Sequence, residues 1–196
     1  REYFDQIQSQ RKKRSLASDD QNAKFAAVVT PHLADAYSLA RWLTRSRADA
    51  DDVLQEACIR AFGAIEQQTG ESSRAWVLAI VRNTAYTWLS NKRASMLIGI
   101  DDLAEKERMQ VELATERADT TGNPESEMIA RADAKQLETL IAGLPMEFRE
   151  TLILRDLQGL GYREISEVIG APIGTVMSRL ARARQRLIAA IKESNS

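Results

Sequence analysis

The side chains best suited to bind a large partner are five cations near the C-terminal end of the chain. Arg179, Arg182, Arg184, Arg186 and Lys192 fall between positions 172 and 192, a stretch without aspartate or glutamate. Guanidinium groups bind phosphates and can pair bidentately with guanine. Arginine near a helix C-terminus is also favoured by the helix dipole, but an ordinary solvated face usually mixes both charge signs. The absence of acids therefore favours a contact with nucleic acid.

Two predicted helices position these cations. The first carries an apolar face formed by Ile165, Val168 and Ile169 at three- and four-residue spacing. Gly170 tolerates the positive φ that ends a helix, and Pro172 suits the first turn of the next one. A short helix, a tight turn and a longer basic helix are typical of a helix-turn-helix, whose second helix enters the DNA major groove.

A second group of candidate residues mixes aromatic, cationic and amide side chains in a helix predicted over 74–93. Trp76, Trp88 and Arg82 belong to it, and the segment holds no acid. Single-stranded nucleic acid is bound by such surfaces, because bases stack on aromatic rings while cations meet phosphates. Helical spacing equally suits Trp76 and Ile80 to a hydrophobic core, so both interpretations stand.

A third candidate surface is the acidic side of a helix predicted from Asp49, its expected N-cap, to about Ile65. One half of this helix is apolar, comprising Val53, Leu54, Ala57, Cys58, Ala61, Phe62 and Ile65. The other half carries Asp52, Gln55, Glu56 and Ile59. An acidic face with one apolar residue in it is either solvated surface or a docking face.

Composition narrows the class of protein. The chain has 196 residues, a net charge of −1 and few glycines and prolines, and helical periods recur where strand alternation is hard to find, so we predict an all-α protein. His32 and Cys58 are the only residues of their kinds, which argues against a metal site and excludes an internal disulfide. Without a Gly-rich phosphate loop either, neither a cofactor nor enzymatic activity is expected.

The chain divides into four predicted parts. A basic run, Arg11-Lys12-Lys13-Arg14, marks a tail that is either mobile or a further nucleic-acid contact. Eleven acids against five bases over 101–138, and the turn-rich TTGNPES, indicate a linker between two small helical domains. With no long apolar run or signal peptide, we expect a cytoplasmic protein without membrane insertion. The parts are the tail over 1–22, a domain over 23–93, an acidic linker over 94–127 and a helix-turn-helix domain over 128–196.

The order of these parts resembles a bacterial sigma factor. Three stretches carry the resemblance: DADDVLQEACIRAF, then SRAWVLAIVRNTAYTWL, then LPMEFRETLILRDLQGLGYREISEVIGAPIGTVMSRLARAR. They are similar to the extracytoplasmic-function group of the sigma-70 family, which keeps only the second and fourth conserved sigma regions. The resemblance implies a dissociable specificity subunit of RNA polymerase that acts in a stress response, with core polymerase, promoter DNA and an anti-sigma factor as partners.

The resemblance also implies roles for particular residues. Those matching the motif that docks on the β′ clamp helices of core polymerase are Asp51, Asp52, Gln55 and Glu56. Those matching the segment that melts and holds the −10 element are Arg74, Trp76, Arg82, Asn83 and Thr84, followed by Lys92 and Arg93, and the polar loop 66–73 matches the one that captures a flipped base. Those matching the recognition helix over the −35 element are Thr175, Ser178, Arg179, Arg182, Arg184 and Arg186.

Three departures from the family pattern bear on promoter choice. Thr87 stands where many members have aspartate, and Ser72-Ser73 replace an aromatic residue before the RAW sequence. Met177 occupies a recognition-helix position that is frequently basic. An alternative from another class is a stand-alone regulator that binds duplex DNA, with 23–93 as a dimerisation or sensor domain. The acidic face and the aromatic-cationic helix favour the sigma factor, because a repressor has no need to melt DNA.

Overall fold

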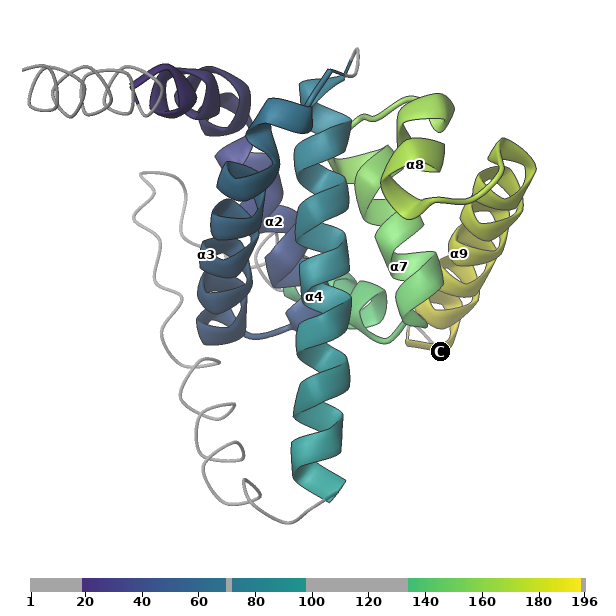
Figure 1. The fold of residues 1–196 in the computed structure, drawn as a ribbon. Coiled ribbons are helices and arrows are strands. Elements are labelled where there is room, and N and C mark those ends of the chain that lie inside the picture. The colour runs from purple at the N-terminus through teal and green to yellow at the C-terminus, as the bar shows by residue number, and fades with distance from the viewer. Residues whose placement is uncertain (1–18, 70–71, 98–133, 195–196) are drawn as a thin grey trace, which may run out of the picture.

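Helices make up all the regular structure in the described part of the protein, which confirms the predicted fold class. The computed structural model describes residues 19–69, 72–97 and 134–194. Figure 1 shows two groups of helices side by side, with the long α4 between α2 and α3 on one side and α7, α8 and α9 on the other. The basic run at 11–14 and most of the predicted linker lie outside the described residues. No helix in the described ranges is both long and apolar enough to cross a bilayer.

Pro31 lies within a segment of helical periodicity over 23–45 and predicts a kink or a break there. In the structure a helix over 19–29 ends at the 3₁₀ turn η1 (Thr30–His32), which contains Pro31, and α2 (Leu33–Thr44) follows. A proline inside a helix removes a hydrogen bond and clashes with the preceding turn, so the break falls where the sequence predicts it. The remaining elements are α3 (Arg47–Ala64), the 3₁₀ turn η2 (Ile65–Gln67) and α4 (Ser73–Leu97).

The start of α3 corrects one prediction. Asp49 is not the N-cap, because Ser46 takes that position and its Oγ accepts a hydrogen bond from the Asp49 amide at 3.2 Å. The chain reaches Ser46 through Arg45, which has a left-handed φ of 62° and ends α2. Asp49 instead uses its carboxylate to bind Lys92 Nζ at 2.7 Å, tying α3 to the C-terminal half of α4. An earlier serine with extended backbone geometry therefore outcompetes the aspartate.

The second group forms the predicted helix-turn-helix. A helix over 134–142 leads to α7 (Met146–Leu152), the π-helical segment η3 (Ile153–Leu157), α8 (Tyr162–Ile169) and α9 (Ile173–Ser194). Gly170 ends α8 with a φ of 64°, as predicted. Ile165 and Val168 on α8 are buried, which confirms the predicted apolar face, and Val176 and Leu180 on α9 are buried as well.

The sequence predicts that Phe148, Leu152, Ile153 and Leu157 pack against the helix-turn-helix, and the structure corrects this prediction for Leu157. Phe148, Leu152 and Ile153 are buried as predicted, but Leu157 is 55% exposed. The amide of Gln158 bonds the carbonyl of Ile153 at 3.0 Å, an i to i+5 bond that widens the turn. Leu157 is the last residue of this segment and lies next to the turn at Gly159, whose φ is 72°, where the chain leaves the helix.

The two groups of helices pack directly against each other. α4 lies along α8, and α2 contacts α7. Arg149 of α7 is buried and donates to the carbonyl of Trp42 at the end of α2 at 3.1 Å. Gln158 Nε2 donates to the carbonyl of Asp35 at 2.8 Å, and Arg74 Nη2 donates to the carbonyl of Gln158 at 2.7 Å. The two helical groups are therefore closed against each other. The prediction of two domains joined by a linker did not include this contact.

Candidate nucleic-acid and protein interfaces

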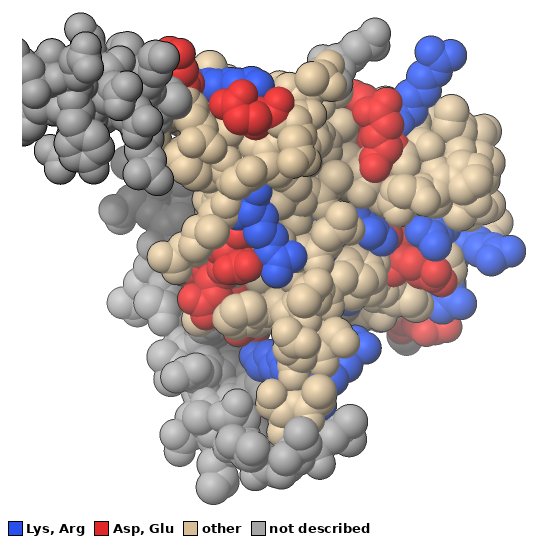
Figure 2. Space-filling model, in the orientation of Figure 1, with Lys and Arg blue, Asp and Glu red and all other residues tan. Residues whose placement is uncertain are grey.

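The acidic face of α3 is exposed, as its spacing predicts. Asp51, Asp52 and Gln55 are exposed, and Glu56 is half-exposed and accepts a hydrogen bond from Arg60 Nε at 2.8 Å. Ile59 is 63% exposed in the middle of this face. Figure 2 shows acidic side chains gathered over α3 with a basic group beside them. The opposite face contributes Val53, Ala57 and Ala61 to the core.

Some of the residues of α4 that are predicted to bind nucleic acid are exposed to solvent, and others are buried. Asn83 and Arg93 are exposed. Trp76 is half-buried against the core, in agreement with the core interpretation. Thr84 is only 2% exposed, and its hydroxyl donates to the carbonyl of Ile80 at 2.8 Å. Thr84 is thus turned into the protein in this form.

The cations at the two ends of α4 are held by acids of the first helical group. Arg74 Nε lies 2.7 Å from Asp35 Oδ2, and Lys92 Nζ lies 2.7 Å from Asp49 Oδ2. Each pair is partly exposed to solvent, so its contribution to stability is on the order of 1 kcal/mol or less. These two cations are positioned by their partners but remain near the surface.

Arg82 is held by Glu150, a buried carboxylate of the second helical group. Arg82 donates to it twice, from Nε at 2.7 Å and from Nη2 at 3.1 Å, while Tyr86 Oη donates at 2.9 Å. The guanidinium also lies over the Tyr86 ring, 4.3 Å from its centroid. The Glu150 side chain has no exposed surface. Two bonds from one guanidinium to one carboxylate form a strong, directional pair.

Burial and charge shift the pKa values of both α4 partners. Burial lowers the pKa of Arg82, but the hydrogen bonds and negative charge of Glu150 outweigh it, and the net change is upward. Burial, reinforced by the charge of Glu150, raises the pKa of Tyr86 to about 12. Arg82 therefore stays cationic and Tyr86 stays neutral at any physiological pH.

The predicted DNA-binding residues of the recognition helix α9 differ in their exposure and in their contacts with the rest of the protein. Thr175 is half-buried in the first turn, and the exposed Ser178 donates its hydroxyl to the Thr175 carbonyl at 3.0 Å. Arg182 is exposed and makes no ion pair with another described residue. Arg184 binds both oxygens of Asp156, at 2.6 and 3.1 Å. Arg186 lies over Phe148, 5.1 Å from the ring centroid.

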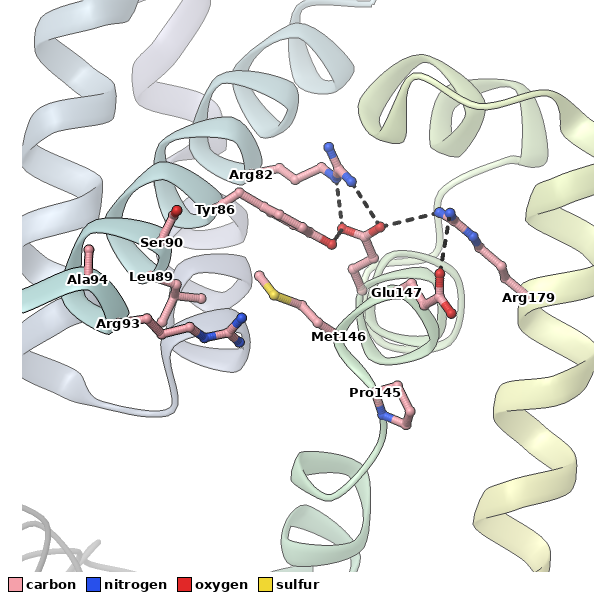
Figure 3. A pocket seen from close by; sticks show the side chains of 11 residues that line it. Arg82, Tyr86, Leu89, Ser90, Arg93, Ala94, Pro145, Met146, Glu147 and Arg179 are labelled. Atoms are coloured by element: carbon pink, nitrogen blue, oxygen red, sulfur yellow. Dashed lines mark hydrogen bonds and ion pairs between the residues drawn. The ribbon is translucent and has the colours of Figure 1, made fainter. Parts of the chain in front are cut away.

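Arg179 reaches from α9 to the same buried carboxylate as Arg82. Its Nη1 lies 3.6 Å from Glu150 Oε1, and its Nη2 lies 3.5 Å from Glu147 Oε2. Figure 3 shows Arg82 and Tyr86 entering from one side and Arg179 from the other, beside an open cavity of about 710 Å³. Two residues predicted for different DNA elements thus converge on one acid.

Sequence reasoning missed Glu150 and Tyr86. A signal for Glu150 was available, since it precedes the buried Ile153 and Leu154 by three and four residues. An acid on the apolar face of a helix indicates a buried ion pair or a functional group. Nothing in the spacing of Tyr86 indicates its partner. Within the described ranges, no cluster of three histidine, cysteine, aspartate or glutamate side chains is arranged to hold a metal ion.

An all-α protein with a basic, exposed second helix in a helix-turn-helix belongs to the class of DNA-binding transcription proteins. Comparison with known families is more specific. Residues 28–95 match sigma-70 region 2, and residues 134–187 match sigma-70 region 4.

Curated relatives agree with this match. The ECF RNA polymerase sigma-E factor of Haemophilus influenzae is 34% identical over 154 residues, covering 76% of this chain and 79% of the relative. The sigma-E factor of Escherichia coli is 33% identical over 140 residues, covering 71% and 72%. The chain belongs to the ECF sigma factors of the sigma-70 family, which direct RNA polymerase to promoters and are not themselves enzymes.

Solved structures share the fold. The sigma factor RpoE in complex with the anti-sigma factor NepR from Bartonella quintana superposes with a TM-score of 0.62 at 23% identity, covering 86% of this chain and 96% of that one. CnrH in complex with the cytosolic domain of CnrY gives a TM-score of 0.56 at 20% identity, covering 88% and 89%. These likenesses confirm the two helical units.

Proposed function

We propose that three surfaces of this sigma factor divide the work of promoter recognition. The acidic face of α3, centred on Asp52 and Glu56, docks on the β′ clamp helices of core polymerase. The exposed side of α4 holds the −10 element, and α9 reads the −35 element. The protein acts in the cytoplasm, where the polymerase works.

The observation that carries this proposal is the division of α9 into two faces. Val176, Leu180 and Ala183 are buried against the rest of the second helical group. Ser178 and Arg182 lie on the opposite side, exposed to solvent. A recognition helix must be anchored on one side and free on the other to enter the major groove. Arg182 is the side chain best placed to read a guanine, because no described acid holds it.

We propose that fewer residues of α4 contact the −10 element than the family motif suggests. Asn83 and Arg93 are exposed and available to a single strand. Trp76 and Thr84 support α4 from within, since one packs against the core and the other bonds its own helix. Phosphates of the strand would be bound by Arg74, Arg82 and Lys92 after their ion pairs with acidic residues break.

An anti-sigma factor is the proposed regulatory partner. One of the solved structures that share this fold is the sigma factor RpoE in complex with the anti-sigma factor NepR. Such a partner would connect release of the sigma factor to a stress signal, as the family resemblance implies.

Co-purification tests the docking proposal. Asp52→Lys combined with Glu56→Lys should abolish capture of core polymerase by the tagged protein, because both charges of the docking face are reversed. Folding should be preserved, since exposed charge changes usually cost under about 0.5 kcal/mol. Asp19→Lys with Asp20→Lys is the matched control, because both residues are exposed acids of the same helical group and neither belongs to α3. Undiminished capture by the α3 variant would discard the docking role.

The same experiment separates the sigma factor from a stand-alone regulator. A regulator would bind its duplex sites tightly without polymerase and would not retain polymerase on a column. A sigma factor should retain polymerase and bind promoters strongly only in its presence.

A further inference from the structure

Three helices from both halves of the protein meet at the buried carboxylate of Glu150. α4 contributes Arg82 and Tyr86, which bond it at 2.7 to 3.1 Å, and α9 contributes Arg179 at 3.6 Å. The side chain of Glu150 is completely buried. A buried charge of this kind is stable only while its partners stay, because losing them leaves it desolvated and unpaired. The carboxylate therefore holds α4 against α7.

The contacts of Arg82 and Arg179 with the same carboxylate are geometrically incompatible with binding of both promoter elements. Under the proposed function, Arg82 belongs to the −10 surface and Arg179 to the −35 surface. Elements centred at −10 and −35 are roughly 25 base pairs apart, on the order of 85 Å of duplex at about 3.4 Å per step. In the closed protein both guanidinium groups lie within 4 Å of one carboxylate. One molecule cannot hold Glu150 with both arginines and place them on both elements.

We propose that Glu150 is an autoinhibitory latch, which keeps the free sigma factor in a closed form unable to engage both promoter elements. This inference rests on the proposed function of α4 and α9. Two further contacts support the closed form without using a predicted base-contacting side chain of α9. Gln158 Nε2 binds the carbonyl of Asp35 at 2.8 Å, and Arg149 binds the carbonyl of Trp42 at 3.1 Å.

A latch changes apparent affinity through populations. The apparent dissociation constant equals the intrinsic one divided by the fraction of molecules in the competent form. A variant that weakens the latch should therefore bind DNA more tightly, although none of its DNA-contacting residues has changed. A residue with a merely structural role would lose binding when replaced, because the fold would be damaged.

The first test compares Glu150→Gln with Glu147→Gln. Both remove one negative charge from α7 next to Arg179, but only Glu150 also bonds Arg82 and Tyr86 of α4. The distance between the two helical groups is followed by spin labels on Asn22→Cys and Gln185→Cys in a Cys58→Ala background, since positions 22 and 185 are exposed. We expect Glu150→Gln to broaden and lengthen the distance distribution, and Glu147→Gln to leave it unchanged.

Binding is measured in the same proteins by fluorescence anisotropy. The probe is a labelled pool of duplex DNA with a randomised central segment. Glu150→Gln should bind about tenfold more tightly than the wild type if the open form is a minor species. Equal tightening by both substitutions would attribute the gain to lost negative charge alone and would overturn the latch.

A second variant tests the latch in case Glu150→Gln unfolds. Tyr86→Phe combined with Gln158→Ala removes two bonds between the helical groups and leaves the Arg82–Glu150 pair in place. It should open the molecule partly and tighten DNA binding by a few-fold. Unchanged distances in this folded variant and in a folded Glu150→Gln would overturn the latch. A protein that opens as expected but never captures core polymerase would overturn the proposed function instead.

Discussion

At the scale of single residues, neighbours decide what each arginine of α9 can do. Arg182 is exposed without a described acidic partner, whereas Arg186 lies over the Phe148 ring and Arg184 is bound to Asp156. A free guanidinium near the middle of a recognition helix can pair with guanine, while one held against the protein can only approach the DNA backbone.

This difference predicts distinct effects on promoter choice. Arg182→Ala should cost roughly 1–3 kcal/mol on the preferred promoter and relax base preference at one −35 position. Arg186→Ala should weaken all promoters about equally and reduce the salt dependence by roughly one unit of slope. Transcription from a library of −35 variants measures both. A uniform loss for both variants would show that Arg182 only positions the helix.

Tyr86 reports on the closed form through its ionisation. Its raised pKa, about 12 against an ordinary 10, comes first from burial and then from the charge of Glu150. Since the folded protein holds this proton more tightly than the unfolded chain, the stabilisation is present below pH 10 and is lost as the pH rises toward about 12.

The absorbance of the phenolate measures this ionisation. The chain has four tyrosines, and the difference between titrations of the wild type and Tyr86→Phe isolates Tyr86. Glu150→Gln should bring the Tyr86 transition back toward 10, because it removes the second cause of the shift and exposes the ring. A transition that stays near 12 in that variant would mean that the ring remains buried without the latch.

At the scale of elements, the turn of the helix-turn-helix depends on one left-handed residue. Gly170 has a φ of +64°, with open space where a Cβ would stand. Gly170→Ala should therefore destabilise the protein through backbone strain alone, by roughly 1–2 kcal/mol. Gly174→Ala is the control, because this glycine lies within α9, also beside open space, and should be neutral or stabilising by up to about 1 kcal/mol. Urea unfolding followed by circular dichroism compares the two, and equal effects would refute the strain argument.

Much of each element followed from local sequence rules. The period of α3 separates its buried alanines from Asp52 and Gln55, and Pro31 and Gly170 place a break and a turn. Rules of this kind work because they depend on neighbours within one or two turns. They failed at Asp49, where the competing Ser46 lay just outside the predicted helix, and at Leu157, which is exposed where the helical segment ends.

At the scale of the whole molecule, the arrangement of the two helical groups was beyond the sequence. Arg82 and Glu150 are 68 residues apart, and nothing in local spacing pairs them. The family match fixes which groups exist, but it does not determine whether they touch. The candidate surfaces were predicted one by one, whereas the shared carboxylate that connects two of them required the tertiary structure.

The wide turn between α7 and the helix-turn-helix has a consequence for changes in chain length. The segment from Ile153 to Leu157 accommodates one more residue per turn than an α-helix would. Deleting a single residue there would remove the extra residue that the wide turn accommodates and convert it to an α-helical turn, with little rotation of the chain that follows. The same deletion within α8 or α9 would rotate everything after it by about 100°. A one-residue deletion is therefore easier to accommodate between Ile153 and Leu157 than in the neighbouring helices.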